Sequence, residues 1–206
     1  MSEIRPSKIV CVGRNYAKHA AEMGNDVPSE PLIFLKPPSA LIGEGEPIVM
    51  PPGVGRVDYE GEIGVVIGTR ARNVAPENAW NHVEALVPIN DVTARDLQAA
   101  DDQWTRAKGF DTFCPVGTPV PVSEVDFSVL GVTTRVNGEV RQQGDARDMV
   151  YDIPTILSFV SGIMTLEPGD LIATGTPDGI APLAEGDEVE IDVAGVGSVR
   201  NPVVQG

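Results

Sequence analysis

Glycine and proline occur so often in this chain that long helices have little room to form. The sequence holds 22 glycines and 18 prolines, which separate many short apolar runs. Both residues weaken helix interiors, whereas short apolar runs bounded by turn residues are typical of strands. We therefore predict a mainly β fold with short helices, an α+β arrangement dominated by sheet. The predicted strands are residues 8–12, 32–36, 63–67, 85–90, 129–136, 170–174 and 188–193.

Three short segments have helical patterns, at residues 15–23, 93–101 and 153–161. Gly24 follows the first segment as a C-terminal cap. Thr93 and Asp96 have the spacing of a capping box at the start of the second. Asn137-Gly138 lies between two short runs with strand-like composition and predicts a type I′ hairpin turn.

The length of 206 residues suits one domain with a sizeable core. Because no repeat or linker-like stretch divides the sequence, we expect a single domain over residues 1–206. No uninterrupted apolar stretch approaches the roughly 18 residues of a membrane span, so no membrane partner is expected. The polar start at residues 1–8 has no apolar segment behind it. This predicts no secretory signal and a cytoplasmic location.

The formal net charge of −15 restricts the partners that this protein can bind. It argues against nucleic acid, because phosphate binding needs clustered lysines and arginines. It also repels anionic substrates, so a small acid must be held by a metal ion and a few placed cations. Cys11 and Cys114 lack Cys-x-x-Cys spacing, and we interpret them as buried thiols without a redox or zinc role.

Glu60 and Glu62 lie at the start of a segment that is otherwise built for burial. Alternation along a strand points both carboxylates to one face, opposite to Ile63 and Val65. Two unpaired buried carboxylates would cost several kcal/mol, on the order of a protein's whole margin of stability. A hard divalent ion removes this cost, since carboxylate oxygens are the ligands that Mg²⁺ and Mn²⁺ accept. The alternative is a solvent-facing edge strand with Glu at alternate positions.

Asp91 is the third candidate ligand, at the point where the predicted strand 85–90 ends. Arg95 and Gln98 follow it three residues apart on the predicted helix, so both would face whatever Asp91 holds. A guanidinium fork and an amide suit a planar carboxylate group of a substrate. The alternatives are a helix-capping Asp91 and ordinary exposed positions for Arg95 and Gln98.

The chain resembles the fumarylacetoacetate hydrolase family, which includes acylpyruvases and oxaloacetate decarboxylases. The resemblance covers nearly the whole chain. The segments that carry it, in order, are Val12-Gly13-Arg14-Asn15-Tyr16-Ala17-Lys18-His19, Phe34-Leu35-Lys36-Pro37, Glu60-x-Glu62, Asp91-x-Thr93-Ala94-Arg95-Asp96-x-Gln98, Ala107-Lys108-Gly109-Phe110-Asp111, Val136-Asn137-Gly138-Glu139, Gly169-Asp170 and Thr174-Gly175-Thr176-Pro177.

The resemblance implies a β-sandwich roll that pairs into a homodimer. It also implies a Mg²⁺ or Mn²⁺ ion held by Glu60, Glu62 and Asp91. Two departures concern substrate size. Relatives often have His-His where this chain has Asp58-Tyr59, and they have a longer segment where this chain has only residues 99–106.

Lys108 is the natural second cation of such a site. In a chain of net charge −15, we expect a lysine in a strand-and-turn segment rich in aromatic residues to point toward the substrate. The alternative is a side chain that reaches solvent. Thr176 lies in a segment that alone would be only a turn, and the resemblance implies that it donates to a substrate oxygen. Arg14 and Lys36 lie in matching motifs and are left as structural residues. His82 has no role.

His19 and Glu22 are spaced three apart on the first predicted helix and form a candidate dyad. Glu22 would orient the imidazole, whose other nitrogen would take a proton from water. Alone, the spacing favours an ordinary surface pair that shares a helical face. The resemblance implies that this helix is part of a mobile lid, which we expect over residues 13–30.

These residues predict a metal-dependent hydrolase that cleaves a carbon–carbon bond of 2,4-dioxo acids, of acylpyruvate or fumarylpyruvate type. A 2-oxo acid can chelate a metal ion, which stabilises the negative charge of the leaving pyruvate fragment. The alternative within enzymes is an oxaloacetate or 2-oxo-hexenedioate decarboxylase or isomerase of aromatic catabolism, which needs no hydrolytic water. A further alternative is a non-catalytic metal or carboxylate binder, which the presence of Lys108 and the dyad disfavours.

Overall fold

Two sheets, built mainly from the short apolar runs, contain most of the strands in the described part of the chain. The computed structural model describes residues 4–206, so part of the polar start 1–8 lies outside the described residues. The first sheet has six strands in the order β10-β7-β6-β13-β1-β2, and only β1 and β13 run parallel. Its strands are β1 (Ile9–Gly13), β2 (Leu32–Lys36), β6 (Gly61–Ile67), β7 (Val83–Asn90), β10 (Val120–Pro121) and β13 (Leu171–Ala173).

The second sheet has five strands in the order β12-β11-β14-β15-β4. Its strands are β4 (Ile48–Met50), β11 (Gly131–Val136), β12 (Glu139–Asp145), β14 (Glu188–Val193) and β15 (Gly197–Gln205). The hairpin predicted at Asn137-Gly138 joins β11 to β12, and both residues have the positive φ of a type I′ turn. Two small pairs complete the strands: β3 (Leu41–Ile42) with β9 (Cys114–Pro115), and β5 (Val57–Asp58) with β8 (Thr93–Ala94).

β6 is buried on both faces because it lies inside the first sheet, between β7 and β13. Ile63 and Val65 belong to the larger apolar cluster, together with Ile191 of the second sheet, whereas Val66 belongs to a second cluster on the other face. The edge-strand interpretation of Glu60 and Glu62 is therefore wrong.

Gly61 explains why the two glutamates are separated by a residue without a side chain. A Cβ atom at Gly61 would lie 2.1 Å from Oγ1 of Thr134 and 3.1 Å from Cδ1 of Ile191. Both neighbours belong to the second sheet, which approaches β6 closely at this point. Only glycine fits on that face, while the glutamates on either side of it point the opposite way.

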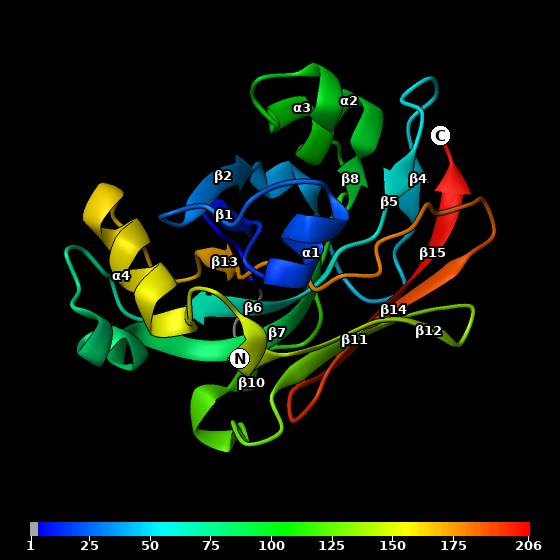
Figure 1. Cartoon of the computed structure of the whole chain (residues 1–206). Helices are drawn as coiled ribbons and strands as arrows, with labels where there is room; N and C mark the ends of the chain where they lie inside the picture. The colour runs from blue at the N-terminus through cyan, green and yellow to red at the C-terminus, as the bar shows by residue number, and fades with distance from the viewer. Residues whose placement is uncertain (1–3) are drawn as a thin grey trace.

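The helices are short, as predicted, and Figure 1 shows them on the outside of the sheets. They are α1 (Ala17–Glu22), α2 (Arg95–Ala100), α3 (Thr105–Lys108) and α4 (Ile153–Ile163), with 3₁₀ turns η1 (Pro38–Ala40), η2 (Pro76–His82), η3 (Val122–Glu124) and η4 (Ala146–Asp148). The predicted capping box is wrong: α2 begins only at Arg95, because Thr93 pairs with β5 and its hydroxyl donates to the carbonyl of Asp91. The strand-and-turn prediction for Lys108 is also wrong, since this residue ends α3.

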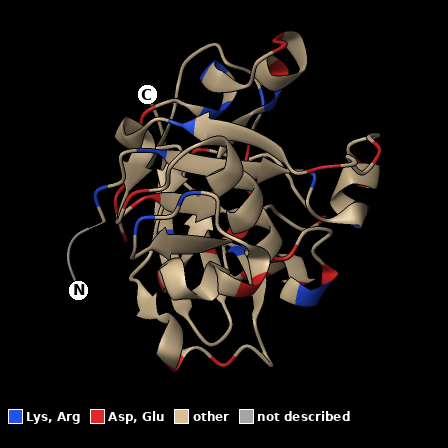
Figure 2. Ribbon diagram, turned by 90° about the vertical axis from the view of Figure 1, so that its left-hand side faces the viewer, with Lys and Arg blue, Asp and Glu red and all other residues tan. Residues whose placement is uncertain are grey.

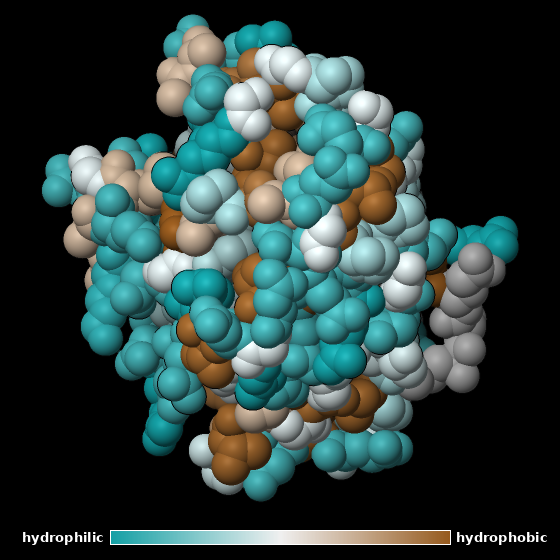
Figure 3. All heavy atoms as spheres, turned by 90° about the vertical axis from the view of Figure 1, so that its right-hand side faces the viewer, coloured by the Kyte–Doolittle hydropathy of each residue, from teal (hydrophilic) through white to brown (hydrophobic). Residues whose placement is uncertain are grey.

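The surface agrees with the acidic composition. Figure 2 shows acidic segments spread over loops and strand ends, with the fewer basic segments scattered among them. On the face drawn in Figure 3, apolar residues form separate groups among hydrophilic ones. Within residues 4–206, no helix has the length and apolar character that a membrane crossing requires.

Asp170 ties the N-terminal segment to the start of β13. Its buried carboxylate accepts hydrogen bonds from the backbone and hydroxyl of Ser7, the backbone and ammonium of Lys8, and the backbone of Glu167, at 2.5–3.1 Å. Burial alone would raise the pKa of Asp170, but the Lys8 ammonium and the other donors outweigh burial and lower it.

We expect Asp170→Asn to lower the free energy of unfolding by about 2–4 kcal/mol at pH 7, because the variant removes a buried charge and leaves several donors without their acceptor. Since the folded pKa is depressed, this contribution is present above the unfolded pKa of about 3.9 and is lost as the pH falls through the folded value. Urea unfolding should therefore show a difference between wild type and variant that shrinks below about pH 4. Asp126→Asn, at an exposed residue whose carboxylate accepts from the neighbouring Ser128, is the control and should change little.

Candidate metal centre and active site

Three buried carboxylates meet where β6 and β7 adjoin. Glu60 precedes β6, Glu62 lies within it, and Asp91 directly follows β7. The strands are antiparallel with Gly61 opposite Asn90, so the start of one lies beside the end of the other. Oxygen atoms from the three side chains all lie within 4.8 Å of one another. The structure thus brings together the three residues that the sequence marked as metal ligands.

Two buried lysines lie against this carboxylate cluster. Lys108 Nζ donates to Glu60 at 2.7 Å and to Asp91 at 2.6 Å, so its side chain does not reach solvent. Lys36 Nζ donates to the other oxygen of Asp91 at 2.6 Å and to the carbonyl of Val92 at 3.1 Å. Sequence reasoning left Lys36 as a structural residue. Its place in an apolar strand of a chain with four lysines was the signal that could have revealed this contact.

The two lysines form ion pairs with Glu60 and Asp91 but not with Glu62. Within residues 4–206 no lysine or arginine nitrogen lies within ion-pair distance of Glu62, which accepts a hydrogen bond from the backbone N–H of Gly175 at 2.7 Å. Burial, and then the charges of Asp91 and Glu60, raise the pKa of Glu62 well above its usual value. For Glu60, burial alone would also raise the pKa, but Arg95 and Lys108 outweigh it and hold the pKa below its usual range.

This donor set suits a hard divalent cation. Three carboxylates supply oxygen ligands at a spacing that one ion can bridge, and Glu62 is buried with no lysine or arginine ion-pair partner among residues 4–206. An ion would offset the burial and the neighbouring carboxylates that disfavour the ionised form of Glu62, and would favour the ionised form of all three groups. Glu60, Glu62 and Asp91 therefore form a carboxylate site fit for a metal ion.

Arg95 and Gln98 reach the same cavity from α2. The Arg95 guanidinium donates to Asp58 at 2.8 Å, to Gln98 at 2.7 Å and to Glu60. Asp58 is fully buried and also accepts two hydrogen bonds from Arg56, at 2.7 and 2.9 Å. Asp58, one of the two residues that depart from the resemblance, therefore positions Arg95. A direct contact of Arg95 and Gln98 with substrate stays a prediction.

His19 and Glu22 are in contact, as their spacing predicted. His19 Nδ1 lies 3.3 Å from Glu22 Oε2, and the imidazole is buried at 6% exposure on the wall of the cavity. The Glu22 carboxylate also accepts a hydrogen bond from the backbone N–H of Gly179, at 3.0–3.2 Å. This contact joins α1 to the loop that follows Thr176. The pair is therefore no isolated surface pair.

Thr176 lines the cavity, but its hydroxyl already has partners. It donates to the carbonyl of Gly61 at 2.8 Å and accepts from Gln142 at 2.9 Å. The loop is thereby fixed to β6 and β12. A donation from Thr176 to substrate would require this hydroxyl to exchange its partner, and its predicted role stays a prediction.

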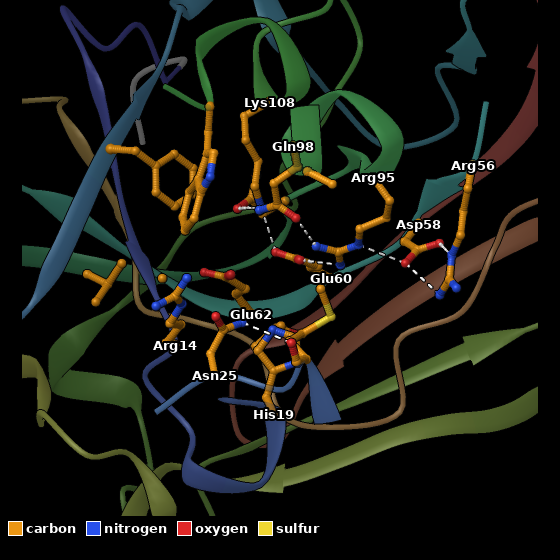
Figure 4. Close-up of a pocket in the computed structure, with 18 of the residues that line it drawn as sticks. Arg14, His19, Asn25, Arg56, Asp58, Glu60, Glu62, Arg95, Gln98 and Lys108 are labelled. Atoms are coloured by element: carbon orange, nitrogen blue, oxygen red, sulfur yellow. Dashed lines mark hydrogen bonds and ion pairs between the residues drawn. The ribbon is translucent and has the colours of Figure 1, made fainter. Parts of the chain in front are cut away.

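The cavity has a volume of about 470 Å³. Figure 4 shows Glu60, Lys108 and Arg95 on one side of it, with His19 and Arg14 on the other side of Glu62. Lys108 is protonated at neutral pH: burial alone would lower its pKa, but Asp91 and Glu60 outweigh burial and raise it. The cavity thus combines a candidate metal-ligand cluster, a fixed ammonium group and an imidazole within one open pocket.

Comparison with known proteins identifies the family of this chain. The fumarylacetoacetate (FAA) hydrolase C-terminal family matches residues 8–204. The chain belongs to the fumarylacetoacetate hydrolase family. The family predicted from the sequence is therefore confirmed, and so is the mainly β, α+β fold with short helices in one domain.

Relatives in this family have different named activities. The mitochondrial oxaloacetate tautomerase FAHD1 of Mus musculus is 45% identical over 93% of this chain and 89% of its own length. A structure of 5-carboxymethyl-2-hydroxymuconate delta-isomerase from Mycobacterium smegmatis is 45% identical, with a TM-score of 0.91 over 98% of this chain and 80% of its own. Fumarylpyruvate hydrolase from Pseudomonas aeruginosa, in complex with Mn²⁺ and pyruvate, is 31% identical, with a TM-score of 0.91 over 98% and 91% of the two chains.

The chain is thus an enzyme of the fumarylacetoacetate hydrolase family with a buried carboxylate site, and it acts on small molecules. The relatives include isomerases, a tautomerase and a hydrolase, so family membership alone does not select the reaction. One of them binds Mn²⁺. The homodimer, the cytoplasmic location and the mobility of residues 13–30 stay predictions.

Proposed function

We propose that this protein is a divalent-metal-dependent hydrolase that cleaves a carbon–carbon bond of 2,4-dioxo acids, of acylpyruvate or fumarylpyruvate type, to pyruvate and a carboxylic acid. The observation that carries the proposal is the His19–Glu22 pair on the wall of the cavity that contains the carboxylate cluster. Hydrolysis needs both a stabilised negative charge and an activated water molecule. The likeness to a fumarylpyruvate hydrolase structure that holds Mn²⁺ and pyruvate supports this choice.

Glu60, Glu62 and Asp91 would hold the Mg²⁺ or Mn²⁺ ion. When bound, the ion supplies Lewis acidity toward a 2-oxo acid, the carboxylate and ketone oxygens of which suit chelation. The remaining contacts come from the protein. Arg95 keeps Glu60 in place, and Asp58 in turn keeps Arg95 in place, so the ligand geometry is set by side chains that are themselves buried.

Lys108 supplies a positive charge in a position that does not depend on substrate. Its two hydrogen bonds to Glu60 and Asp91 fix Nζ beside the cluster, and its raised pKa keeps it cationic rather than basic. A fixed cation in a water-poor cavity stabilises charge that develops as the carbon–carbon bond breaks. Lys108 therefore acts as an electrostatic group in the proposed reaction and not as the base.

His19 is the proposed general base. Glu22 holds Nδ1, which leaves Nε2 to accept a proton from a water molecule. The oxygen of that water forms a bond to the acyl carbonyl carbon. The bond from this carbon to C3 of the pyruvate unit then breaks, its electron pair stays on C3, and a proton from His19 completes pyruvate. Water is consumed, and the imidazole returns to its starting state.

A second candidate is oxaloacetate tautomerisation, favoured by the identity of 44–46% with mitochondrial oxaloacetate tautomerases over 93% of the chain. Tautomerisation moves a proton between carbon and oxygen without addition of water. The same imidazole can move this proton, and the same Lys108 can stabilise the charge. Decarboxylation of a β-oxo acid, a third reaction that this site could perform, needs neither water nor a base.

His19→Ala separates the two reactions that use the imidazole from decarboxylation, which does not. We expect the variant to lose about 100- to 1000-fold in kcat/KM for acetylpyruvate hydrolysis, because general-base catalysis contributes about that much, while metal-dependent oxaloacetate decarboxylation survives. Hydrolysis is followed by loss of the dioxo-acid absorbance, and tautomerisation by loss of enol absorbance. His82→Ala is the matched control, since His82 is the only other histidine in the sequence and contacts Thr69 on the surface.

Unchanged acetylpyruvate cleavage by His19→Ala would remove the dyad from the mechanism. If the metal-loaded wild type does not turn over acylpyruvates but tautomerises oxaloacetate rapidly, the second candidate function is selected. No turnover of any 2-oxo acid would favour a non-catalytic binder.

Residues 13–30 are proposed to act as a lid. The start of the segment is anchored, because Asn15 makes hydrogen bonds to Thr174 and Tyr151 and is buried, as is Tyr16. Farther along, the Glu22 carboxylate accepts from Gly179, and the Tyr151 hydroxyl donates to the Pro28 carbonyl at 2.6 Å. Because single hydrogen bonds of this kind are weak relative to core packing, the later part of the segment is able to open for substrate and close behind it.

A further inference from the structure

Arg14 differs from the other cations around the cavity. Lys108, Arg56 and Arg95 also line it, and each has carboxylate partners within hydrogen-bond distance. Among residues 4–206, no carboxylate lies within ion-pair distance of Arg14, whose recorded contact is an aromatic ring. A guanidinium group on a cavity wall without an acidic partner is an available anion-binding group.

The backbone around Arg14 is held in a fixed and unusual conformation. Arg14 has a φ of 58°, in the left-handed region that non-glycine residues seldom occupy. Its neighbour Asn15 is buried, and the Asn15 side chain makes hydrogen bonds of 2.7–2.9 Å to Thr174 and to both backbone groups of Tyr151. These contacts outweigh the local strain, and they fix where the Arg14 side chain begins.

Trp104 sets the direction of the Arg14 side chain. The guanidinium carbon lies 6.0 Å from the centre of the Trp104 ring. The indole approaches this closely because Gly13 has no side chain: a Cβ atom there would lie 2.9 Å from the ring. Trp104 packs edge-on against Phe34, and Lys108 Nζ lies 4.9 Å from the Phe34 ring centre. The Phe34 and Trp104 rings therefore form one aromatic surface. Lys108, at the carboxylate cluster, lies beside Phe34, and Arg14 lies beside Trp104.

We propose that Arg14 binds a second carboxylate of the substrate, at the end of the acyl group. This inference rests on the proposed function, in which the first carboxylate and the ketone of the 2-oxo acid lie at the metal site. A second carboxylate has to enter a cavity of an acidic protein, so it requires a cation of its own. In Figure 4, Arg14 lies on the opposite side of Glu60 and Glu62 from Arg95 and Arg56. The substrate class is thus a 2,4-dioxo acid with two carboxylates, and Arg14 determines that specificity.

The kinetic test compares two dioxo acids that differ in the acyl end, with Mn²⁺-loaded full-length protein. Fumarylpyruvate carries a terminal carboxylate, and acetylpyruvate ends in a methyl group. We expect Arg14→Met to lower kcat/KM for fumarylpyruvate by about 10- to 100-fold, the range for a hydrogen bond between charged groups, and to change acetylpyruvate by less than about threefold. Arg14→Lys should retain part of the preference, because it keeps the charge but not the planar fork.

A binding measurement makes the test independent of turnover. Calorimetry with Mn²⁺-loaded protein compares 2-oxoglutarate with 2-oxopentanoate, which have the same length and differ in the terminal carboxylate. Oxalate, which is too short to span from the metal site to a distant cation, is the control. We expect the wild type to prefer 2-oxoglutarate, and Arg14→Met to lose that preference while oxalate binding stays unchanged.

The outcomes separate the two proposals. Suppose that the wild type shows no turnover but prefers 2-oxoglutarate, and that Arg14→Met abolishes this preference. This result would reject the hydrolase and support the role of Arg14. Equal losses for fumarylpyruvate and acetylpyruvate, together with weakened oxalate binding, would show that Arg14 only maintains the structure and would overturn the inference. A wild type that does not distinguish the compounds within either pair would overturn it as well. Thermal unfolding of each variant verifies that it is folded.

Discussion

Glu62→Gln should abolish divalent-ion binding and lower kcat/KM by at least about a thousandfold, while the metal-free variant stays as stable as the metal-free wild type or becomes more stable. The reason is the unequal distribution of cations around the cluster. Glu62 is buried, and no lysine or arginine of the described chain contacts it. Without an ion, burial and the charges of Asp91 and Glu60 disfavour the ionised form of Glu62, which costs stability. An amide of the same shape removes that cost but also removes a ligand.

Glu60→Gln is the informative counterpart, because it removes a ligand that does have cationic partners. Glu60 accepts from Lys108 at 2.7 Å and from Arg95, and both cations are buried. The variant should also lose the metal ion, but its metal-free form should unfold with about 3 kcal/mol less free energy, the order of cost for breaking a buried ion pair.

Both variants can be measured by calorimetric titration with Mn²⁺ and by urea unfolding in chelator. Wild type should gain thermal stability on addition of Mn²⁺, and neither variant should. A Glu62→Gln protein that binds Mn²⁺ as tightly as wild type, or a metal-free form several kcal/mol less stable than wild type, would contradict the proposed role of Glu62.

Lys108→Met should lower kcat/KM by about a thousandfold, since the fixed charge beside the cluster contributes several kcal/mol to the transition state. The methionine side chain has similar length, so the loss is of charge more than of volume. The metal-free variant should also be less stable, because Glu60 and Asp91 lose the ammonium group between them. A bound divalent ion replaces part of that charge, so Mn²⁺ should raise the melting temperature more in the variant than in wild type.

Lys36→Met provides the matched control for this prediction. Lys36 is buried and contacts Asp91 as Lys108 does, but it does not line the cavity. Its loss should reduce stability and weaken metal binding, and saturating Mn²⁺ should restore most of kcat. Lys108→Met should keep its defect in kcat at saturating Mn²⁺. Equal kcat defects in the two variants would show that Lys108 acts only by holding the cluster together.

The three candidate metal ligands could be placed near one another from sequence because their meeting depends on local patterns, and the family resemblance marked them as ligands. Alternation places Glu60 and Glu62 on one face, and Asp91 follows the strand that pairs with theirs. An antiparallel pair brings the start of one strand beside the end of the other. The sequence did not reveal that β6 is central in its sheet, and that position is what makes the burial of both glutamates obligatory.

The helix boundaries near the site were less predictable. Thr93 and Asp96 have the spacing of a capping box. Thr93 and Ala94 pair with β5 instead, so the helix begins two residues later, at Arg95. Tertiary hydrogen bonds compete successfully here with a local capping pattern. Lys108 lies in a helix of four residues, which is too short to have a periodic signal.

By itself, the sequence determined the fold class, the Asn137-Gly138 hairpin and the spacing of His19 and Glu22, because each depends on alternation, turn geometry or separations of a few residues. The resemblance to a family added the candidate ligand set. Only the tertiary structure decided which cation meets which carboxylate. Lys36 and Lys108 are 55 and 17 residues from Asp91, and Arg95 is 37 from Asp58. Contacts between residues so far apart depend on how β2, α2 and α3 pack at the ends of β6 and β7. Among residues 4–206, the same packing left Glu62 without a lysine or arginine partner and Arg14 without a carboxylate partner.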